Sequence, residues 1–303
     1  VQANAGWVFT GWDKSFDKVT ADTVVTAQYA AITYVLTVNS GTITYVNKVL
    51  TLANTLNINS GGVFNLGSAG QLKLASGKYL NVNTGGLLKT EGTGADNAII
   101  THSAGYYFIS VKNGGTISAK YTYFQYLNYV QLMSGSTLDP ANAFYRCTFT
   151  NNSAAPSGAV LSFANDQVVS IHEANFIALN SGYNVLKSND AGHVYFKDAT
   201  GAYAGATYEN DPYNRIDWVA STPGLWTGVT SSDWYTASNW DDYNVPTAST
   251  DVTIPEDSDH YPVIGAGNAY CNNLIITWAT LTQNAGSSFY VSGDFDSDDG
   301  QFN

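Results

Sequence analysis

Arg146, His172 and Glu173 are the residues of this chain whose types come closest to those of a polysaccharide-cleaving site. A lyase needs carboxylates that hold calcium and a basic side chain that takes a proton, whereas a hydrolase needs paired carboxylates. The three residues could share one face of a repetitive fold, but no pair of Asp residues recurs at the same spacing. We therefore interpret them as solvated side chains of an outer face and predict no catalytic residue.

The acidic segment GDFDSDDG is the best candidate for a metal site. Asp294, Asp296, Asp298 and Asp299 offer the oxygen ligands that calcium prefers. An EF-hand loop has glycine at its sixth position, whereas Gly300 falls at the seventh position here. Calcium is thus the one cofactor candidate, and a solvated acidic turn with no cofactor is the alternative. The histidines show no HxH or HExxH spacing, so no zinc site is predicted.

A group of tyrosines crowds one short part of the sequence: Tyr106, Tyr107, Tyr121, Tyr123, Tyr126 and Tyr129. Alternation along a strand would place Tyr121 and Tyr123 on one face and Tyr126 on the other, with one of these sets pointing outward. An exposed aromatic strip can stack on sugar rings or bind a partner protein. The last four tyrosines are our candidates for glycan or partner contact. Aromatic ladders that merely cover the edges of the strands are the alternative.

The composition excludes several classes of protein. The 303 residues include 12 Lys+Arg and 24 Asp+Glu, which gives a net charge of −12, while charged residues make up 12% and aromatic residues 14%. A disordered acidic tail would be richer in charge and poorer in aromatic residues. The basic residues are few and scattered, so we expect no nucleic-acid binding. No apolar run is long enough to span a membrane, so we expect no membrane insertion.

A repeat of eight residues dominates positions 56–94. One column of the repeat contains Leu56, Phe64, Leu72, Leu80 and Leu88, and a second contains Ile58, Leu66, Leu74 and Val82 until Thr90 interrupts it. Polar residues separate the two columns, and this alternation is typical of half-buried strands. Glycine-rich turns end each strand. Hairpins and a parallel solenoid both fit short strands with tight corners, but the constant step favours the solenoid.

Three steps of eight residues make about 24 residues, which is close to one triangular coil. Leu56 would then stack on Leu80, and Phe64 on Leu88, in coils about 4.8 Å apart. The pattern continues more loosely in four phenylalanines whose intervals suit irregular coils: Phe124, Phe149, Phe176 and Phe196. The sequence thus predicts an all-β fold, with a parallel β-helix of about eight turns over residues 34–218 and small β modules on both sides. Cys147 and Cys271 then fall in different modules, and we expect two buried free thiols.

The N-terminal segment resembles the end of a Listeria–Bacteroides repeat of the internalin B type. The matching motifs are Phe9-Thr10-Gly11-Trp12-Asp13, Val19-Thr20 and Val25-Thr26-Ala27-Gln28-Tyr29. The resemblance implies that residues 1–33 are the C-terminal part of such a repeat and that the chain is a piece of a longer protein. We expect Trp12 and Tyr29 to anchor a very small core.

The C-terminal segment resembles modules of large Bacteroidota cell-surface and type IX-secreted proteins. The motifs that carry this resemblance include Trp226, Trp234, Asn239-Trp240, Val245-Pro246, Asp251-Val252-Thr253-Ile254-Pro255, Tyr261-Pro262 and Cys271-Asn272-Asn273-Leu274. Trp278 departs from the pattern, because these modules tend to carry glycine there. The resemblance implies that residues 219–303 begin a second solenoid-like module. The middle solenoid is similar in architecture to the pectate-lyase-like superfamily, which implies a right-handed helix.

These resemblances imply a non-catalytic structural or adhesive protein, secreted to the outer cell surface, which forms a stiff stalk or filament segment. Its partners would be neighbouring modules, copies of itself, polysaccharides or other cell-surface proteins. Asp22-Thr23-Val24 fits a short pattern associated with O-glycosylation in Bacteroidota surface proteins, so Thr23 is a candidate for modification. A polysaccharide lyase or hydrolase on a β-helix is the first alternative function, and a carbohydrate-binding module is the second.

Overall fold

The computed structural model describes residues 7–13, 26–31, 35–103, 105–150, 159–178 and 182–303, so the candidate modification site Thr23 lies outside the described residues. Regular structure in these residues is almost all β-strand, apart from the 3₁₀ turns η1 (Pro140–Asn142), η2 (Ala206–Tyr208) and η3 (Ala237–Asn239). In the same part of the chain, no helix is long and apolar enough to cross a membrane. The chain divides into two compact units, Val1–Trp218 and Val219–Asn303.

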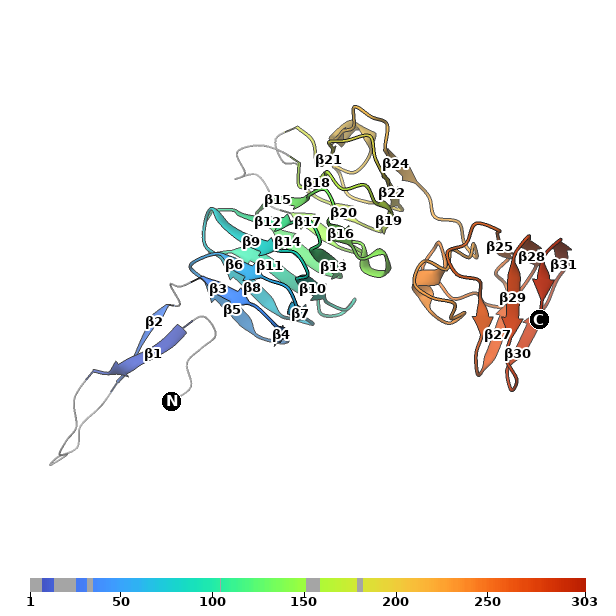
Figure 1. The fold of residues 1–303 in the computed structure, drawn as a ribbon, viewed down its shortest axis with the longest axis horizontal. Helices are drawn as coiled ribbons and strands as arrows, with labels where there is room; N and C mark the ends of the chain where they lie inside the picture. The colour runs from blue at the N-terminus through green and yellow to red at the C-terminus, as the bar shows by residue number, and fades with distance from the viewer. Residues whose placement is uncertain (1–6, 14–25, 32–34, 104, 151–158, 179–181) are drawn as a thin grey trace. The chain divides into compact units, whose positions relative to one another are not determined.

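The first unit is a stack of coils whose strands pair in parallel with those of the next coil (Figure 1). Its eight-stranded sheet contains β3 (Leu36–Val38), β6 (Leu56–Ile58), β9 (Lys78–Val82), β12 (Tyr107–Val111), β15 (Leu127–Leu132), β18 (Leu161–Phe163), β21 (Val185–Lys187) and β23 (Glu209–Asn210). Its six-stranded sheet contains β5 (Val49–Leu52), β8 (Gln71–Leu74), β11 (Ala98–His102), β14 (Thr122–Gln125), β17 (Thr148–Thr150) and β20 (Asn175–Phe176).

Two further sheets complete the walls of this stack. The five-stranded sheet contains β4 (Gly41–Tyr45), β7 (Gly62–Gly67), β10 (Leu87–Glu91), β13 (Thr116–Lys120) and β16 (Thr137–Leu138). A three-stranded sheet contains β19 (Val168–His172), β22 (His193–Lys197) and β24 (Ile216–Val219). The predicted register is confirmed, because Leu56 pairs with Leu80 and Phe64 with Leu88 in neighbouring coils. All four side chains are fully buried, so the fold is the parallel β-solenoid that the eight-residue repeat indicates.

Columns of small and polar residues form one type of corner in the first coils. Gly85 adopts a φ of +70°, and its N–H donates to the carbonyl of Gly114 in the next coil at 2.7 Å. Two residues before this corner, the Asn83 amide donates to Asn59 at 2.7 Å, and the Asn59 amide donates to Asn39 at 2.8 Å. Glycine allows the left-handed turn, and the amide ladder bonds consecutive coils to one another.

The core changes from aliphatic to aromatic along the first unit. Phe124 stacks on Phe149 with ring centroids 5.3 Å apart, and Phe149 stacks on Phe176 at 5.1 Å. Phe196 does not continue this column, because it lies on β22, meets Phe176 edge-on and stacks on Trp218 at 4.3 Å. At this end of the unit, aromatic contacts therefore connect the six-stranded sheet with the three-stranded sheet, which the residue intervals alone did not indicate.

The N-terminal strands form an antiparallel pair, β1 (Trp7–Trp12) and β2 (Ala27–Ala31), in which Phe9 lies opposite Tyr29. The Trp12 side chain is 41% exposed. The strand pairing is present, and a small core anchored by Trp12 and Tyr29 stays a prediction.

The second unit repeats the same construction on a smaller scale. Parallel pairing joins β25 (Val252–Ile254), β28 (Leu274–Thr277) and β31 (Phe295–Asp298), and likewise β26 (Val263–Ile264), β29 (Thr280–Gln283) and β32 (Gln301–Phe302), with β27 (Asn268–Cys271) paired to β30 (Ser288–Val291). Trp226, Trp234 and Trp240 are fully buried at the start of this unit. Their segment bonds to the edge of the first coil, since the Trp226 N–H donates to the Thr253 carbonyl at 2.9 Å. The tryptophans thus close the beginning of the stack.

Both cysteines are free and buried, as predicted. Burial raises the pKa of Cys147 to about 12 and that of Cys271 to about 11. Because the thiolate is the reactive form, we expect neither thiol to react with a disulfide reagent in the native protein near neutral pH. Both should react once guanidinium chloride unfolds the chain. A chromogenic thiol assay with and without denaturant checks this, with Cys147→Ser and Cys271→Ser assigning each signal. Fast reaction of either native thiol would contradict the burial described here.

Candidate functional site

Arg146 and Glu173, two of the three residues that resemble those of a polysaccharide-cleaving site, meet at a corner of the first unit. The Arg146 Nε donates to the Glu173 carboxylate at 2.9 Å, and an Arg146 Nη donates to the Tyr121 hydroxyl at 3.2 Å. The backbone carbonyl of His172 accepts from the Arg146 N–H at 3.1 Å, and the His172 side chain is buried. The interpretation as outer-face residues is therefore correct for Arg146 and Glu173 and wrong for His172.

The shape of this corner explains why residues from three coils meet there. Tyr121, Arg146 and Glu173 all adopt left-handed backbone conformations, with φ of 45°, 50° and 52°. Their N–H groups donate to carbonyls of the next coil, such as Tyr121 to Tyr145 at 2.9 Å and Glu173 to Lys197 at 2.8 Å. Each coil therefore turns at the same place, and the three side chains gather on the outside of one corner.

The electrostatics of the corner favour binding over proton transfer. The hydrogen bond that Arg146 donates to Glu173 raises the pKa of Arg146 above its ordinary value, so the guanidinium stays protonated and is poorly suited to act as a base. The guanidinium carbon lies 5.7 Å from the ring centroid of Tyr121 and 5.3 Å from that of Tyr145. Burial, and then the hydrogen bond with Tyr121, raises the pKa of Tyr145. The corner thus holds an Arg146–Glu173 ion pair whose guanidinium lies close to the rings of Tyr121 and Tyr145.

A second aromatic group lies on the outer side of the eight-stranded sheet. Tyr79 on β9 stacks on Phe108 of β12 with ring centroids 4.5 Å apart, and Phe108 contacts Tyr129 of β15 at 4.9 Å. Burial and a hydrogen bond with Tyr79 raise the pKa of Tyr129 to about 12. The rings cover one another along the stack, so the ladder offers mostly ring edges to a ligand.

The four candidate tyrosines do not form one strip. Tyr121 joins the Arg146 corner, Tyr129 joins the ladder, and Tyr126 lies edge-on against His102 at 4.1 Å. Tyr123 lies on β14 and is the most exposed of the four at 37%. Left-handed turns at Tyr121 and Tyr126 interrupt the alternation that the sequence analysis assumed. Contact of these residues with a glycan or partner stays a prediction, and Tyr123 is the member best placed for it.

Sequence reasoning missed Tyr79 and Phe108 as members of the ladder. A signal was available, because Tyr79, Phe108 and Tyr129 each precede a buried core residue: Leu80, Ile109 and Val130. The outward position beside the inward column is therefore aromatic in three successive coils. Columns of outward positions are as informative as inward ones in a solenoid, because both stack in register.

Lys187 is a buried lysine that no pattern in the sequence indicates. It follows Leu132 and Phe163 in register along the eight-stranded sheet, and its side chain is fully buried. Its ammonium donates to the carbonyl of Asn165 at 3.0 Å, to that of Ala191 at 2.5 Å and to the side chain of Asn189. Burial lowers its pKa. Because three oxygens satisfy the ammonium, Lys187 holds a loop together rather than facing a ligand.

The structure places the predicted calcium ligands on β31 and directly beside it. Phe295 on β31 lines an apolar cavity of about 320 Å³ with Leu274 and Phe289, so alternation turns Asp296 and Asp298 to the outer side. Asp299 follows at a corner with φ of 53°. Asp294 precedes the strand, and its N–H donates to the Asn273 side chain at 2.8 Å. The residues that the structure describes contain no converging group of three or more His, Cys, Asp or Glu. Calcium binding by these aspartates stays a prediction.

The charge of the chain is concentrated in the second unit, a signal that the sequence analysis did not use. Residues 219–303 contain 11 Asp+Glu and no Lys or Arg, whereas residues 1–218 contain 13 Asp+Glu and 12 Lys+Arg. The net charges are therefore −11 and −1, which together give the −12 of the whole chain. A partner that binds the second unit through electrostatic attraction would therefore have to be cationic.

Comparison with known proteins gives one match. The family described as a domain of unknown function (DUF8693) matches residues 225–303, which lie within the second unit. No curated protein and no solved structure matches the chain. The matched segment begins just before the buried tryptophans and includes all strands of the second unit.

Proposed function

We propose that the chain is a rigid, non-catalytic segment of an extracellular surface protein and that it presents binding surfaces to glycans or partner proteins. The observation that carries this proposal is the continuous stack of the first unit. Its eight-stranded sheet runs from β3 to β23, and its sheets together surround one apolar core. Each inner coil bonds to the coils on both sides, so bending would strain many hydrogen bonds together. Such a stack suits a spacer that holds binding surfaces away from a cell.

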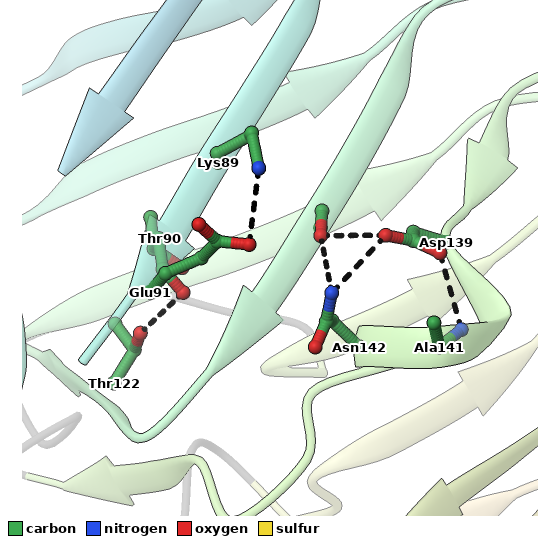
Figure 2. A network of polar contacts seen from close by, with 8 residues as sticks. Lys89, Thr90, Glu91, Thr122, Asp139, Ala141 and Asn142 are labelled. Carbon is green, nitrogen blue, oxygen red and sulfur yellow. Dashed lines mark hydrogen bonds and ion pairs between the residues drawn. The ribbon is translucent and has the colours of Figure 1, made fainter. Parts of the chain in front are cut away.

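Polar contacts on the outer side of the five-stranded sheet add to this rigidity (Figure 2). Lys89 and Glu91 form an ion pair along β10 at 3.1 Å. Further along the same sheet, the Ser118 hydroxyl donates to Asp139 at 2.7 Å, and Asp139 also accepts from the Ala141 N–H at the start of η1. The Lys89–Glu91 pair lies within one strand, whereas the Ser118–Asp139 bond joins neighbouring coils, which supports a structural role for this face.

The binding surfaces in this proposal are the Arg146 corner and Tyr123. A sugar ring stacks best on an aromatic face that is not already covered. Tyr79 and Tyr123 are similarly exposed, at 36% and 37%, but Tyr79 already stacks on Phe108 within the ladder. The Arg146 guanidinium adds a charge that hydrogen-bonds to carboxylates, so acidic polysaccharides are the first ligands to test.

A polysaccharide lyase is the second candidate function, because the Arg146–Glu173 pair joins a cation and a carboxylate at one exposed corner. The protonated state of Arg146 supports binding of an acidic sugar rather than removal of its proton. Retention without cleavage is therefore the outcome that distinguishes the two candidates.

The test is a panel of immobilised acidic and neutral polysaccharides on which retention and cleavage of the glycan are measured together, with and without calcium. We expect saturable retention of the 303-residue chain and no release of new reducing ends or unsaturated sugars. Tyr123→Ala should weaken retention about tenfold, at the upper end of one stacking contact. Tyr290→Ala, which removes an exposed tyrosine from the second unit, is the matched control and should have no effect.

Two results would overturn the proposal. Release of cleaved product would assign the chain to the lyases or hydrolases. Absence of retention on every polysaccharide, together with no capture of a cell-surface protein, would remove the adhesive function. Equal loss of retention in Tyr123→Ala and Tyr290→Ala would show that aromatic surface in general, rather than the six-stranded sheet, holds the glycan.

A further inference from the structure

Trp278 occupies an unusual position at a corner of the second unit. It follows β28 with a φ of 50°, a conformation that favours glycine, and its side chain is 58% exposed. The corner is fixed on two sides, because the Trp278 N–H donates to the carbonyl of Asp298 at 3.1 Å and its carbonyl accepts from the Tyr261 hydroxyl at 3.4 Å. A large aromatic ring is thus held in solvent by a well-bonded backbone.

Exposed apolar and acidic residues occupy neighbouring register positions on the sheet β25-β28-β31, next to this corner. Ile275 on β28 is exposed and pairs in register with Asp296 on β31. Thr277 pairs in register with Asp298, and Asp299 forms the next corner after Trp278. Neighbouring coils lie about 4.8 Å apart, so the carboxylates of one coil border the apolar groups of the previous coil.

This arrangement matches the chemistry of lysine and arginine side chains. The face of an indole ring attracts a cation, and Trp is the best of the aromatic residues at doing so. The apolar stems of Lys and Arg pack on surfaces such as Ile275, while their charged heads reach neighbouring carboxylates. The second unit carries 11 acidic residues without any Lys or Arg, so its field attracts a cationic partner and repels an anionic one.

We propose that the face formed by Ile275, Trp278, Asp296, Asp298 and Asp299 binds Lys- and Arg-bearing segments of a basic partner protein. The inference deepens the proposed function, because it gives the chemistry of one partner of the adhesive segment. The calcium prediction involves the same aspartates in a different role. Here Asp296, Asp298 and Asp299 would bind the Lys and Arg side chains of the partner, whereas Asp294, in the turn before β31, would take no part.

The test is calorimetric titration of the 303-residue chain with a blocked tetra-arginine peptide. We expect saturable binding that weakens as salt is added. Trp278→Gly should weaken binding about tenfold, because it removes the cation–π contact. This variant suits the left-handed corner, so it should fold at least as well as the parent chain. Asp296→Asn/Asp298→Asn should weaken binding by a similar factor and reduce its salt dependence.

A charge-matched variant separates the local site from the overall field. Asp96→Asn/Asp190→Asn removes two exposed carboxylates from the first unit and should leave tetra-arginine binding unchanged. Equal weakening by both double variants would mean attraction to net charge alone and would overturn the site. Absence of tetra-arginine binding would overturn it as well, and would leave the polysaccharide test of the proposed function, which depends on Tyr123, unaffected.

Two rival ligands give different patterns in the same titration. Calcium binding that depends on Asp296 and Asp298 but not on Trp278, with no tetra-arginine binding, would make the face a metal site. Binding of a neutral cello-oligosaccharide that Trp278→Gly abolishes, again with no tetra-arginine binding, would make it a sugar platform. Either pattern would overturn the proposal of a basic protein partner.

Discussion

Replacement of Gly86 by alanine is expected to lower the free energy of unfolding of the first unit by about 3 kcal/mol, at the upper end of what overpacking costs. A Cβ atom at this position would lie 2.4 Å from the carbonyl oxygen of Ile58 in the preceding coil and 3.0 Å from that of Asn83. Both neighbours are backbone atoms that cannot rotate away. Two coils would therefore have to separate, which weakens the bond from the Asn83 N–H to the Ile58 carbonyl.

Gly77→Ala is the matched control for this substitution. Gly77 has a φ of +70°, but no atom lies within 4 Å of the position of an added Cβ. Alanine there meets only the cost of the left-handed conformation, about 1 kcal/mol. Urea denaturation followed by circular dichroism measures both variants. Equal losses in the free energy of unfolding would show that the close approach between coils at Gly86 does not restrict the size of the side chain at that position.

The second large effect is expected in the second unit, where Trp240→Ala should lower the free energy of unfolding by about 4 kcal/mol. The Trp240 ring is fully buried, with its centroid 4.9 Å from that of Trp226 and 4.8 Å from that of Trp234. Its indole N–H donates to the carbonyl of Trp234 at 2.9 Å. The loss is about half of the stability of a domain of this size, so the second unit should stay folded at room temperature but unfold at a clearly lower temperature than in the parent chain.

Differential scanning calorimetry distinguishes the two units in this experiment. Each unit has its own cluster of buried residues, so only the transition of the second unit should move to lower temperature. Tyr290→Ala removes a ring that is 49% exposed and stacks on Tyr270, and it should cost less than about 1 kcal/mol. A Trp240→Ala transition that coincides with that of Tyr290→Ala would contradict the role of the tryptophans in closing the stack.

The regular coils were predictable because their geometry is local. A strand exposes alternate residues to opposite sides, and a constant step of eight places the same side chains in the same column. The pairing of Leu56 with Leu80 follows from these two rules alone. The rules fail where the step changes, as at Phe196, whose interval from Phe176 fits a coil although the residue lies on a different wall.

The candidate binding residues depend on contacts between coils rather than on spacing. Arg146 and Glu173 meet because irregular coils turn at the same left-handed corner, and an interrupted alternation separates Tyr121, Tyr123 and Tyr126. Trp278 was visible in the sequence as a departure from glycine. Only the fold shows that it keeps the glycine-like turn, that its side chain is 58% exposed and that its N–H donates to the carbonyl of Asp298.

The sequence by itself therefore determined the class of fold, the register of the regular coils and the two free thiols, because periodicity and composition act on each residue through its own neighbours in the chain. The tertiary structure decided which side chains meet outside the core. The contacts of the Arg146 corner join residues 25 and 27 positions apart, and their identity depends on how many residues each corner inserts between one coil and the next.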